Sequence, residues 1–410
     1  MKVKIQTETK KLSGNLKLTG SKSISNRLLI LQALSGKMSP LSNLSNSDDT
    51  TVMLKALSTK EGTIDIGIAG TAMRFLTAYL AIQDADFILT GASRMKERPI
   101  KDLVDALRSL GADIGYLEKD GYPPLSIKGK KLIGGTLSIK ADTSSQFISA
   151  ILMISPYFEK GIQLQLVGEV LSRPYIEMTL NLMQRQGVNH EWVGDTITVL
   201  PGAYTDQVSE VESDWSSISY VFELAALSES AEISLERVDQ VSVQGDQEGM
   251  NYFKKLGIDS NIDNGVLTIR KQTDFIRPEL LEFDCTKTPD LAQTLAATTC
   301  ALGIPMNISG LKSLPIKETD RLMALKVELE KCGAQVTIVD NEALEIIPGP
   351  SFSDKDFTFE TYGDHRMALC LAPLALVSNS VTLNNPRVVN KSYKSYWDDL
   401  ISLGFNVQIS

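Results

Sequence analysis

The sequence predicts an α/β fold made of about six copies of one repeating unit, with buried helices inside and sheets outside. The first observation behind this prediction is a glycine that ends a helical stretch and leads into a short strand. Glycine suits this position because it adopts the left-handed conformation without Cβ strain. It recurs at Gly111, Gly187, Gly257, Gly333 and Gly404, at spacings of 76, 70, 76 and 71 residues.

A small polar cluster that opens an apolar helix is the second recurring feature. The first copy is Ser21-Lys22-Ser23. The markers of the later copies are Thr71, Ser144, Ser216, Asp290 and Asp364, which lie 73, 72, 74 and 74 residues apart. The helices expected after these clusters span 24–34, 72–82, 146–154, 218–227, 291–302 and 365–377.

The character of these helices is the third observation, because several of them are apolar nearly all round. A helix of that kind is buried rather than laid on a surface. Alternating, β-rich segments lie between the helices, at 136–139, 163–166, 196–200 and 381–383. A unit of two helices and several strands cannot bury its helix alone, so the copies are expected to pack together. A single doubly wound sheet fits less well, because no GxGxxG motif follows the first strand.

Composition and charge limit the class of protein. The chain has 410 residues, 43% of them apolar and 22% charged, as in a globular protein of two or three domains. Its 41 Lys and Arg against 50 Asp and Glu leave a net charge of −9, which argues against nucleic acid or an anionic membrane as the main partner. The longest apolar run, 367–377, is about half of the roughly 20 residues that span a bilayer. Since the polar N-terminus does not look like a secretory signal, we expect a cytoplasmic protein.

The cysteines, histidines and acidic pairs do not predict a metal site. With only His190 and His365 in the chain, a zinc site built on imidazoles is not expected. We interpret Asp48 and Asp49 as part of a loop rather than as a magnesium site. The cysteines are too widely and irregularly spaced for a CxxC site or a small disulfide framework, so we expect reduced, buried thiols at Cys285, Cys300, Cys332 and Cys370.

The starts of the expected helices carry the features that point to function. A helix N-terminus offers unpaired N–H groups and a partial positive charge, and therefore attracts anions. We expect a ligand with several negative charges, such as phosphate and carboxylate groups. The cations lie where such a ligand requires them, at Lys22, Arg27, Arg74, His365 and Arg366 and in the segments 94–99 and 317–321.

Each of these clusters also has an ordinary structural explanation when it is taken alone. A Ser-Ser pair before an apolar run is commonly only an N-cap. The segment 317–321 fits a solvated helix start with paired charges, and 94–98 fits an exposed loop. Asp290 fits a helix cap, and His365 fits a core histidine. The repeat favours the functional interpretation, because most of the clusters fall at equivalent points of the period.

A nucleotide-binding P-loop does not occur in the sequence. The nearest approach, at 19–23, has Ser21 where a P-loop needs Gly directly before the Lys, and Leu16 where it needs an earlier Gly. We therefore expect phosphate to be bound by cations and helix ends, without a metal ion.

Six motifs follow one another along the chain: Gly20-Ser21-Lys22-Ser23, Ala69-Gly70-Thr71-Ala72-Met73-Arg74, Arg94-Met95-Lys96-Glu97-Arg98-Pro99-Ile100, Ser144-Ser145-Gln146-Phe147, Lys317-Glu318-Thr319-Asp320-Arg321-Leu322 and Asp364-His365-Arg366-Met367. Together they resemble the 5-enolpyruvylshikimate-3-phosphate synthase family, also called 3-phosphoshikimate 1-carboxyvinyltransferases. The resemblance runs from about residue 11 to residue 400. Any one motif is weak, but six in this order at the family's spacing are specific.

The resemblance implies two similar domains, each of three βαβαββ units, in an inside-out α/β barrel fold. Crossovers near Gly20 and Val243 would give an N-terminal domain of residues 20–243, on the shikimate 3-phosphate side, and a C-terminal domain of 1–19 plus 244–410, with the acid–base residues. The implied reaction transfers the enolpyruvyl group of phosphoenolpyruvate to the 5-hydroxyl of shikimate 3-phosphate and releases phosphate. This step belongs to the shikimate pathway of aromatic amino acid biosynthesis. No cofactor or metal is implied, and we expect a monomer.

The resemblance also assigns site residues one by one. Ser23 and Arg27 would hold shikimate 3-phosphate, Lys22 would reach phosphoenolpyruvate, and Gln146 would touch both substrates. Further residues matched to shikimate 3-phosphate are Ser144, Ser145, Ser172, Tyr175, Asp290 and Lys317. Residues matched to phosphoenolpyruvate are Gly70, Arg94, Arg321, Arg366 and Lys391, with His365 as a further substrate-binding candidate.

The chemistry explains these residue types. Addition of an alcohol to an enol ether needs a base for the hydroxyl proton and an acid for the methylene carbon, and elimination needs both reversed. Asp290 is predicted to be the base. Either Glu318 or Lys22 is the acid, a choice that the sequence leaves open. Guanidinium groups suit bidentate binding of carboxylate and phosphate.

Three positions depart from the family's pattern. Ile68 and Phe75 replace the usual Asn and Pro, which alters the packing behind Gly70 and leaves inhibitor sensitivity open. Ser313 stands where an Asn is common, which weakens any substrate-binding role for residue 313.

Two rival functions fit the sequence less well. The sister enzyme that transfers enolpyruvyl to UDP-N-acetylglucosamine has Lys-Asn early and a Cys in a mobile loop, whereas this chain has Lys22-Ser23 and the segment 94–98 there. A non-catalytic anion-binding protein on the same scaffold would have lost its acid–base pair, and Asp290 and Glu318 are both present.

Overall fold

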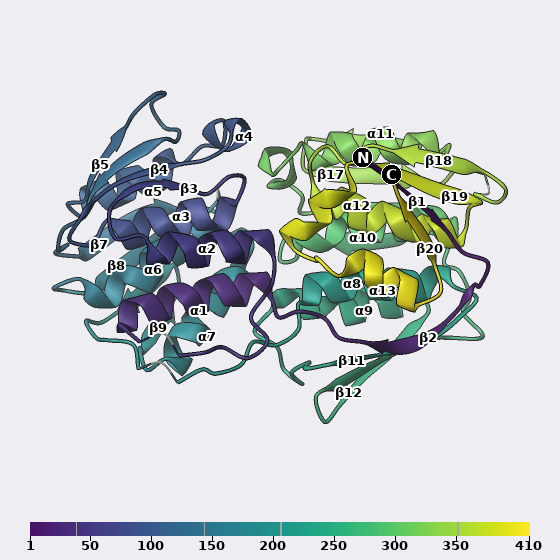
Figure 1. Cartoon of the computed structure of the whole chain (residues 1–410), viewed down its shortest axis with the longest axis horizontal. Coiled ribbons are helices and arrows are strands. Elements are labelled where there is room, and N and C mark those ends of the chain that lie inside the picture. The colour runs from purple at the N-terminus through teal and green to yellow at the C-terminus, as the bar shows by residue number, and fades with distance from the viewer. Residues whose placement is uncertain (38, 143, 206, 351) are drawn as a thin grey trace. The chain divides into compact units, whose positions relative to one another are not determined.

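The computed structural model describes residues 1–37, 39–142, 144–205, 207–350 and 352–410. The chain forms two compact units, each drawn in Figure 1: an N-terminal unit, Gly20–Val211, and a C-terminal unit, Met1–Thr19 with Glu212–Ser410. The chain passes back from the N-terminal unit to the C-terminal unit after Val211, earlier than the crossover predicted near Val243. The reason is that β11 (Ser230–Glu236) already pairs with two strands of the C-terminal unit, β2 (Lys11–Leu16) and β13 (Val266–Lys271).

The helices of the N-terminal unit start at the polar clusters of the sequence. Ser21 and Ser144 each accept a hydrogen bond from a backbone N–H in the first turn that follows. Ser47 caps a helix in the same way, so the interpretation of Asp48 and Asp49 as a loop is wrong. The helices are α1 (Lys22–Ser35), α2 (Asp48–Ser58), α3 (Gly70–Leu80), α4 (Ser93–Lys96), α5 (Lys101–Ser109), α6 (Ser145–Ile154), η1 (Ser155–Tyr157) and α7 (Arg173–Arg185).

The helices of the C-terminal unit follow the same repeat. The predicted helix 365–377 changes to a 3-10 helix after Leu371, because Pro373 has no N–H to continue the α-helical ladder. The helical segments are α8 (Trp215–Leu227), η2 (Gly245–Glu248), α9 (Gly249–Lys254), η3 (Pro289–Leu291), α10 (Ala292–Leu302), η4 (Leu314–Ile316), α11 (Arg321–Lys331), α12 (His365–Leu371), η5 (Ala372–Leu376), η6 (Pro386–Lys391) and α13 (Tyr396–Ser402).

The described residues form five four-stranded sheets with one shared topology. In each sheet one neighbouring pair of strands is parallel and the other two pairs are antiparallel. The N-terminal unit holds β3 (Gly62–Asp65), β4 (Asp86–Thr90), β6 (Leu125–Lys128) and β5 (Asp113–Tyr116), and then β7 (Gly135–Lys140), β8 (Ile162–Val167), β10 (Thr196–Val199) and β9 (His190–Val193).

The sheets of the C-terminal unit include the first strands of the chain. Strand β1 pairs with β19 and β20 at the other end of the sequence. The three sheets are β12 (Ile258–Asp263), β13, β11 and β2; β14 (Leu281–Asp284), β15 (Met306–Ser309), β17 (Ala343–Ile347) and β16 (Gln335–Val339); and β18 (Asp356–Phe359), β19 (Ser380–Asn384), β1 (Lys2–Gln6) and β20 (Asn406–Ile409).

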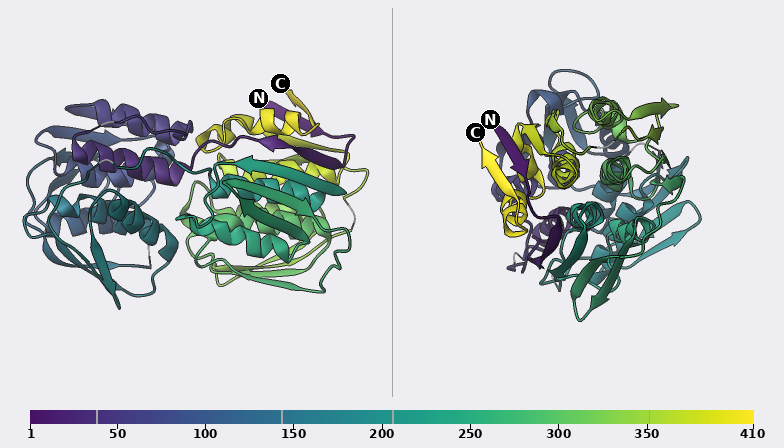
Figure 2. Two further views of the ribbon diagram at one scale, coloured as in Figure 1. Left: turned by 90° about the horizontal axis from the view of Figure 1, so that it is seen from below. Right: turned by 90° about the vertical axis from the view of Figure 1, so that its right-hand side faces the viewer.

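The helices that open at polar clusters are buried, as the sequence predicts. Every residue of α10 except Ala301 is buried, and so is every residue of α8 except Ser216. In the right panel of Figure 2, helices of the C-terminal unit are seen nearly end-on with strands outside them. The predicted fold class is therefore confirmed. The periodic glycines also take left-handed φ values of 100°, 90°, 81°, 87° and 94° at Gly111, Gly187, Gly257, Gly333 and Gly404.

The cysteines agree with the prediction of reduced core thiols, since all four are buried and free of disulfides. Within the described ranges, none of the helices has the length and hydropathy needed to span a bilayer.

Candidate functional site

The predicted residues of the N-terminal unit gather at the starts of its helices. Side-chain hydrogen bonds join these starts. Gln146 on α6 donates from Nε2 to Oγ1 of Thr71 on α3, over 3.2 Å. Arg27 on α1 donates from Nη2 to the backbone oxygen of Tyr175 on α7, over 3.2 Å. We call this set the helix-end cluster; it comprises Lys22, Ser23, Arg27, Gly70, Ser144, Ser145, Gln146, Ser172 and Tyr175.

Arg27 is held firmly inside this cluster. Its side chain is 2% exposed, and it donates from Nε to Oγ1 of Thr179 over 2.7 Å and from Nη1 to the oxygen of Ser23 over 3.0 Å. Burial lowers the pKa of Arg27 to about 10, so it stays a cation at neutral pH. The ring of Phe75 lies 5.2 Å below the guanidinium. The departure at Phe75 is therefore a buried packing contact beneath Arg27, whereas Ile68 is exposed.

Lys22 has a partner that the sequence analysis did not identify. Its Nζ lies 3.4 Å from Oδ2 of Asp49, a buried carboxylate in the first turn of α2. Ser47, a typical N-cap residue, is the sequence signal that could have placed Asp49 in the first turn of a helix. Asp49 therefore holds the ammonium of Lys22 as part of the site rather than binding a metal from a loop.

Two arginines converge on Gly70. Arg74 donates from Nη1 to the oxygen of Gly70 over 3.0 Å. A Cβ built on Gly70 would lie 2.6 Å from Nη1 of Arg98 and 2.8 Å from Nη1 of Arg74, so only glycine fits without moving them. Arg98 was not among the predicted site residues. Arg94, which was predicted, is about half exposed and pairs with Glu97 over 3.0 Å.

Ser172 takes a strained backbone conformation at the start of α7. Its φ of 53° lies in the left-handed region, which is uncommon for a residue with a Cβ. Strain of this kind gathers at binding and active sites. The strain is consistent with the predicted binding role of Ser172.

The predicted residues of the C-terminal unit converge on Arg321. Its side chain is 2% exposed and lies at the start of α11. It donates from Nε to Oδ2 of Asp364 over 2.7 Å, from Nη1 to Oδ1 of Asp290 over 3.1 Å and from Nη2 to Oε2 of Glu318 over 3.1 Å. The interpretation of 317–321 as a solvated helix start is therefore wrong. We call Asp290, Glu318, Arg321, Asp364, Arg366 and Lys391 the carboxylate–arginine network.

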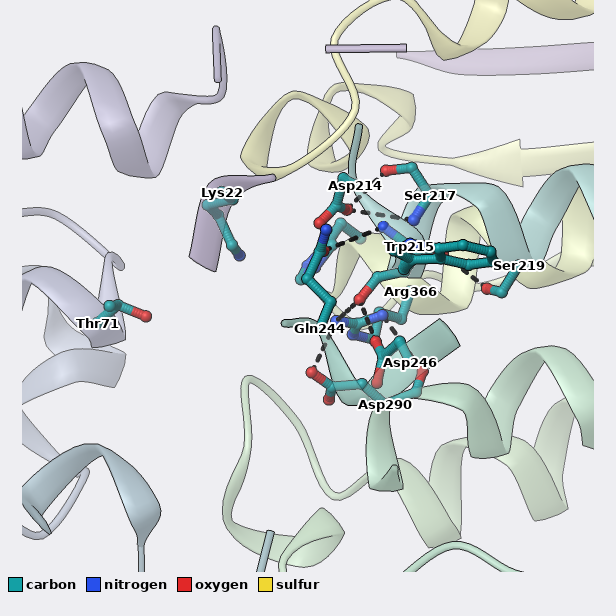
Figure 3. A network of polar contacts seen from close by, with 12 residues as sticks. Lys22, Thr71, Asp214, Trp215, Ser217, Ser219, Gln244, Asp246, Asp290 and Arg366 are labelled. Carbon is teal, nitrogen blue, oxygen red and sulfur yellow. Dashed lines mark hydrogen bonds and ion pairs between the residues drawn. The ribbon is translucent and has the colours of Figure 1, made fainter. Parts of the chain in front are cut away.

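Asp290 is held by two arginines in this network. It lies within η3 rather than capping α10, which excludes the simple cap interpretation. Besides Arg321, it accepts a hydrogen bond at Oδ2 from Nη2 of Arg366 over 2.8 Å, as Figure 3 shows. Burial raises the proton affinity of Asp290, but Arg366, Lys317 and Arg321 outweigh burial and hold its pKa below the usual range. Asp290 is therefore ionised at neutral pH.

The remaining predicted residues lie around Glu318 and Asp364. Lys391 donates from Nζ to Oε1 of Glu318, which is thus paired with two cations. His365 is 2% exposed, and its Nδ1 lies 3.5 Å from Oδ1 of Asp364. Asp364 caps α12 by accepting from the N–H of Arg366 over 2.9 Å. Asp364 was expected at a helix start, within the motif 364–367, but its pairing with Arg321 was not predicted.

Comparison with known proteins agrees with this geometry. The family model described as EPSP synthase (3-phosphoshikimate 1-carboxyvinyltransferase) matches residues 6–59 and 56–400. A 3-phosphoshikimate 1-carboxyvinyltransferase of Bacteroides fragilis is 44% identical over 400 residues, 97% of each chain. One from Colwellia psychrerythraea is 37% identical, covering 95% of this chain and 96% of that protein.

A solved structure supports the fold separately. The EPSP synthase of Acinetobacter baumannii superposes over 100% of both chains with a TM-score of 0.77, at 21% sequence identity. At that identity the likeness speaks for the fold alone. Taken with the family model and the full-length relatives, it leaves one conclusion. This chain belongs to the EPSP synthase (3-phosphoshikimate 1-carboxyvinyltransferase) family.

Proposed function

We propose that the chain transfers the enolpyruvyl group of phosphoenolpyruvate to the 5-hydroxyl of shikimate 3-phosphate and releases phosphate. The observation that carries the proposal is the 44% identity, over 97% of the chain, to a 3-phosphoshikimate 1-carboxyvinyltransferase. The carboxylate–arginine network supports it with an ionised carboxylate and buried cations suited to an anionic substrate. Transfer to UDP-N-acetylglucosamine is not favoured. A monomer in the cytoplasm remains a prediction from the sequence.

Asp290 acts as the general base in this proposal. Its low pKa keeps it ionised, and two arginines fix its orientation. Because the arginines also make it a weak base, we expect the proton to move only after the bond from the hydroxyl oxygen to carbon has begun to form. The hydroxyl is much more acidic at that point. In the elimination step Asp290 gives this proton to the departing phosphate, while the group that protonated the methylene carbon takes a proton back from the methyl group.

Glu318 and Lys22 stay as the two candidates for the acid that protonates the methylene carbon. Glu318 is paired with Arg321 and Lys391, and two cations favour its charged form over the proton-bearing form that an acid needs. Binding of phosphoenolpyruvate could draw Lys391 away from Glu318 and reverse that preference. Lys22, the other candidate, has its Nζ 3.4 Å from Oδ2 of Asp49.

Arg321, Arg366 and Lys391 provide the anion-binding groups of the C-terminal unit, and Gly70 with its arginines and Arg94 provide those of the N-terminal unit. We propose that they bind phosphoenolpyruvate, while Ser144, Ser145, Ser172, Tyr175 and Lys317 bind shikimate 3-phosphate. Arg321 has a second role, since its donors are directed at three carboxylates. It orients Asp290 and Glu318 toward the substrates.

Release of phosphate from phosphoenolpyruvate, measured with purified protein, tests the proposal. Turnover is expected with shikimate 3-phosphate as acceptor. Shikimate, which lacks the phosphate, serves as the matched acceptor control, and UDP-N-acetylglucosamine tests the rival; both are expected to give little or no release. Absence of turnover with shikimate 3-phosphate would sink the assignment, and turnover with UDP-N-acetylglucosamine alone would establish the rival.

Gly70→Ala is expected to raise the KM for phosphoenolpyruvate by about 10- to 100-fold, the equivalent of one charge-assisted hydrogen bond of roughly 1.5 to 3 kcal/mol. The new Cβ would push the ends of Arg98 and Arg74 out of place. Steady-state kinetics with phosphoenolpyruvate varied would measure the change.

Gly202→Ala is the control for this substitution. A Cβ at Gly202, in the same unit, meets nothing within 4 Å, so this variant is expected to keep the wild-type KM. Stability should change little in either variant. An unchanged KM in Gly70→Ala would show that the two arginines do not act on phosphoenolpyruvate.

A further inference from the structure

Asp246 is a second buried carboxylate beside Asp290, and neither the motifs nor the family resemblance singled it out. It lies in η2 and is 4% exposed. Its Oδ2 accepts a hydrogen bond from Oγ of Ser216 over 2.5 Å. Its Oδ1 is buried and makes no hydrogen bond to any of the described residues. Burying this unpaired oxygen costs much free energy when Asp246 is a charged carboxylate, and much less when Asp246 is a neutral carboxylic acid.

Ser216 connects Asp246 to the proposed base. Arg366 donates from Nη2 to Oγ of Ser216 over 3.3 Å and to Oδ2 of Asp290 over 2.8 Å, so one nitrogen spans both groups. Its Nη1 donates to the hydroxyl of Tyr220 over 3.3 Å and to the backbone oxygen of Asp290 over 3.2 Å. Figure 3 shows Asp246, Asp290 and Arg366 together in this network. Asp246 is therefore linked to Asp290 by a chain of three hydrogen bonds that passes through Ser216 and Arg366.

The charges around Asp246 explain why its pKa differs from that of Asp290. The titratable groups that face it are Asp290 from η3, Arg366 from α12, Asp214 at the N-cap of α8 and Cys285 after β14. Burial, followed by the charge of Asp290, raises the pKa of Asp246 to about 7, although Arg366 opposes this. The pKa of Asp290 is held low. Two neighbouring carboxyl groups with separated pKa values have different roles, one as an acid and one as a base.

We propose that Asp246 is a positioning residue for Asp290: as a neutral acid it holds Ser216, and through Ser216 it holds Arg366 against the Asp290 carboxylate. The role rests on the proposed function, since it is a role within that reaction. When Asp246 loses its proton, its charge competes with Asp290 for Arg366. The orientation of Asp290 is then less well defined, and turnover falls.

Two variants separate the parts of this arrangement. Asp246→Asn keeps the oxygen that accepts from Ser216 but cannot ionise. Ser216→Ala removes the link to Arg366 and leaves both carboxylates in place. Glu282→Gln, at an exposed position of β14, is the control for loss of one negative charge in the same unit. The measurements are kcat and both KM values at about pH 6 and about pH 8.5, on either side of the transition expected for Asp246.

The wild type and Glu282→Gln are expected to lose kcat between the lower and the higher pH. Asp246→Asn should keep kcat at the lower pH and show a clearly smaller loss at the higher pH. Ser216→Ala should lower kcat by about tenfold at both pH values, with KM nearly unchanged, as a loss of positioning worth about 1.4 kcal/mol does. The same pH loss in Asp246→Asn as in the wild type overturns the proposal, and so does a wild-type kcat in Ser216→Ala.

A stability measurement tests the neutral state of Asp246 without reference to activity. In the wild type the folded chain holds this proton up to about pH 7, while an unfolded chain releases it near pH 4. Folded protein therefore binds more protons between these values, so its stability falls as pH rises through them. The melting temperature of Asp246→Asn relative to the wild type should rise from about pH 5 to about pH 8. A pH-independent difference overturns the proposal, whereas absence of turnover in the wild type overturns only the proposed function.

Discussion

Asp290→Asn is expected to lower kcat by about 10²- to 10⁴-fold, the usual contribution of a general base. Asparagine keeps the shape of the side chain and can still accept a hydrogen bond from Arg321 or Arg366. It cannot take the hydroxyl proton of shikimate 3-phosphate. Binding of that substrate, measured by calorimetry, should weaken by no more than about tenfold, because one hydrogen bond is altered while the other contacts stay.

The control for this variant is Glu282→Gln, which removes a carboxylate from an exposed strand position in the same unit and should leave kcat unchanged. A folded Asp290→Asn that keeps more than about a tenth of wild-type kcat would contradict the assignment of the base, because that loss is too small for general-base catalysis. A large loss that appears in KM alone would instead make Asp290 a binding residue.

Arg321→Met is expected to lower the free energy of unfolding by about 3 to 5 kcal/mol, the usual cost of breaking a buried ion pair. Methionine fills most of the same space but leaves Asp364, Asp290 and Glu318 without the cation that joins them. Since Arg321 helps to hold the pKa of Asp290 low, Asp290 takes up a proton more readily in the variant, and the deficit should shrink as pH falls toward about 4. Urea unfolding followed by circular dichroism at several pH values would measure both effects.

Arg270→Met is the control for this variant. It tests whether the loss of stability arises because Arg321 is a buried ion-pair partner, or would follow the removal of any arginine. Arg270 pairs with Glu232 over 2.6 Å on the surface of the same unit, where both side chains are more than half exposed. Such a pair contributes about 1 kcal/mol or less, so this variant should unfold nearly as the wild type does. Equal losses in the two variants would contradict a central role for Arg321.

The repeat made most of the fold predictable from the sequence. Glycine at a helix end and a polar cap at a helix start are local signals, so Gly111 and Ser144 could be interpreted without knowing what packs on them. The end of α12 was missed because periodicity outweighed Pro373 in the prediction. The second crossover between the units was predicted too late in the sequence. Its position depends on the pairing of β11, and one partner of β11 is the distant strand β2.

The sequence motifs predicted many residues of the candidate site, but not which side chains contact one another within it. Residues such as Arg321 and Arg366 stand in recognisable runs, and the structure brings each of them to Asp290. Asp49 and Asp246 lie in none of the six motifs, and Arg98, which lies in one of them, was not assigned a role in the site. Their importance depends on which side chain lies opposite after folding, and a single sequence carries no direct record of that.

Strand β1 also dictates an order of events during synthesis. It is made first, yet its partners β19 and β20 are made last. At about 5 to 20 residues per second, β1 waits on the order of 20 to 80 seconds after it is made, while the N-terminal unit, one continuous stretch of chain, can already fold. An unpaired strand invites aggregation, and exposed lysines discourage it. Lys2 and Lys4 lie on the exposed face of β1, so the unpaired strand carries two positive charges through that interval.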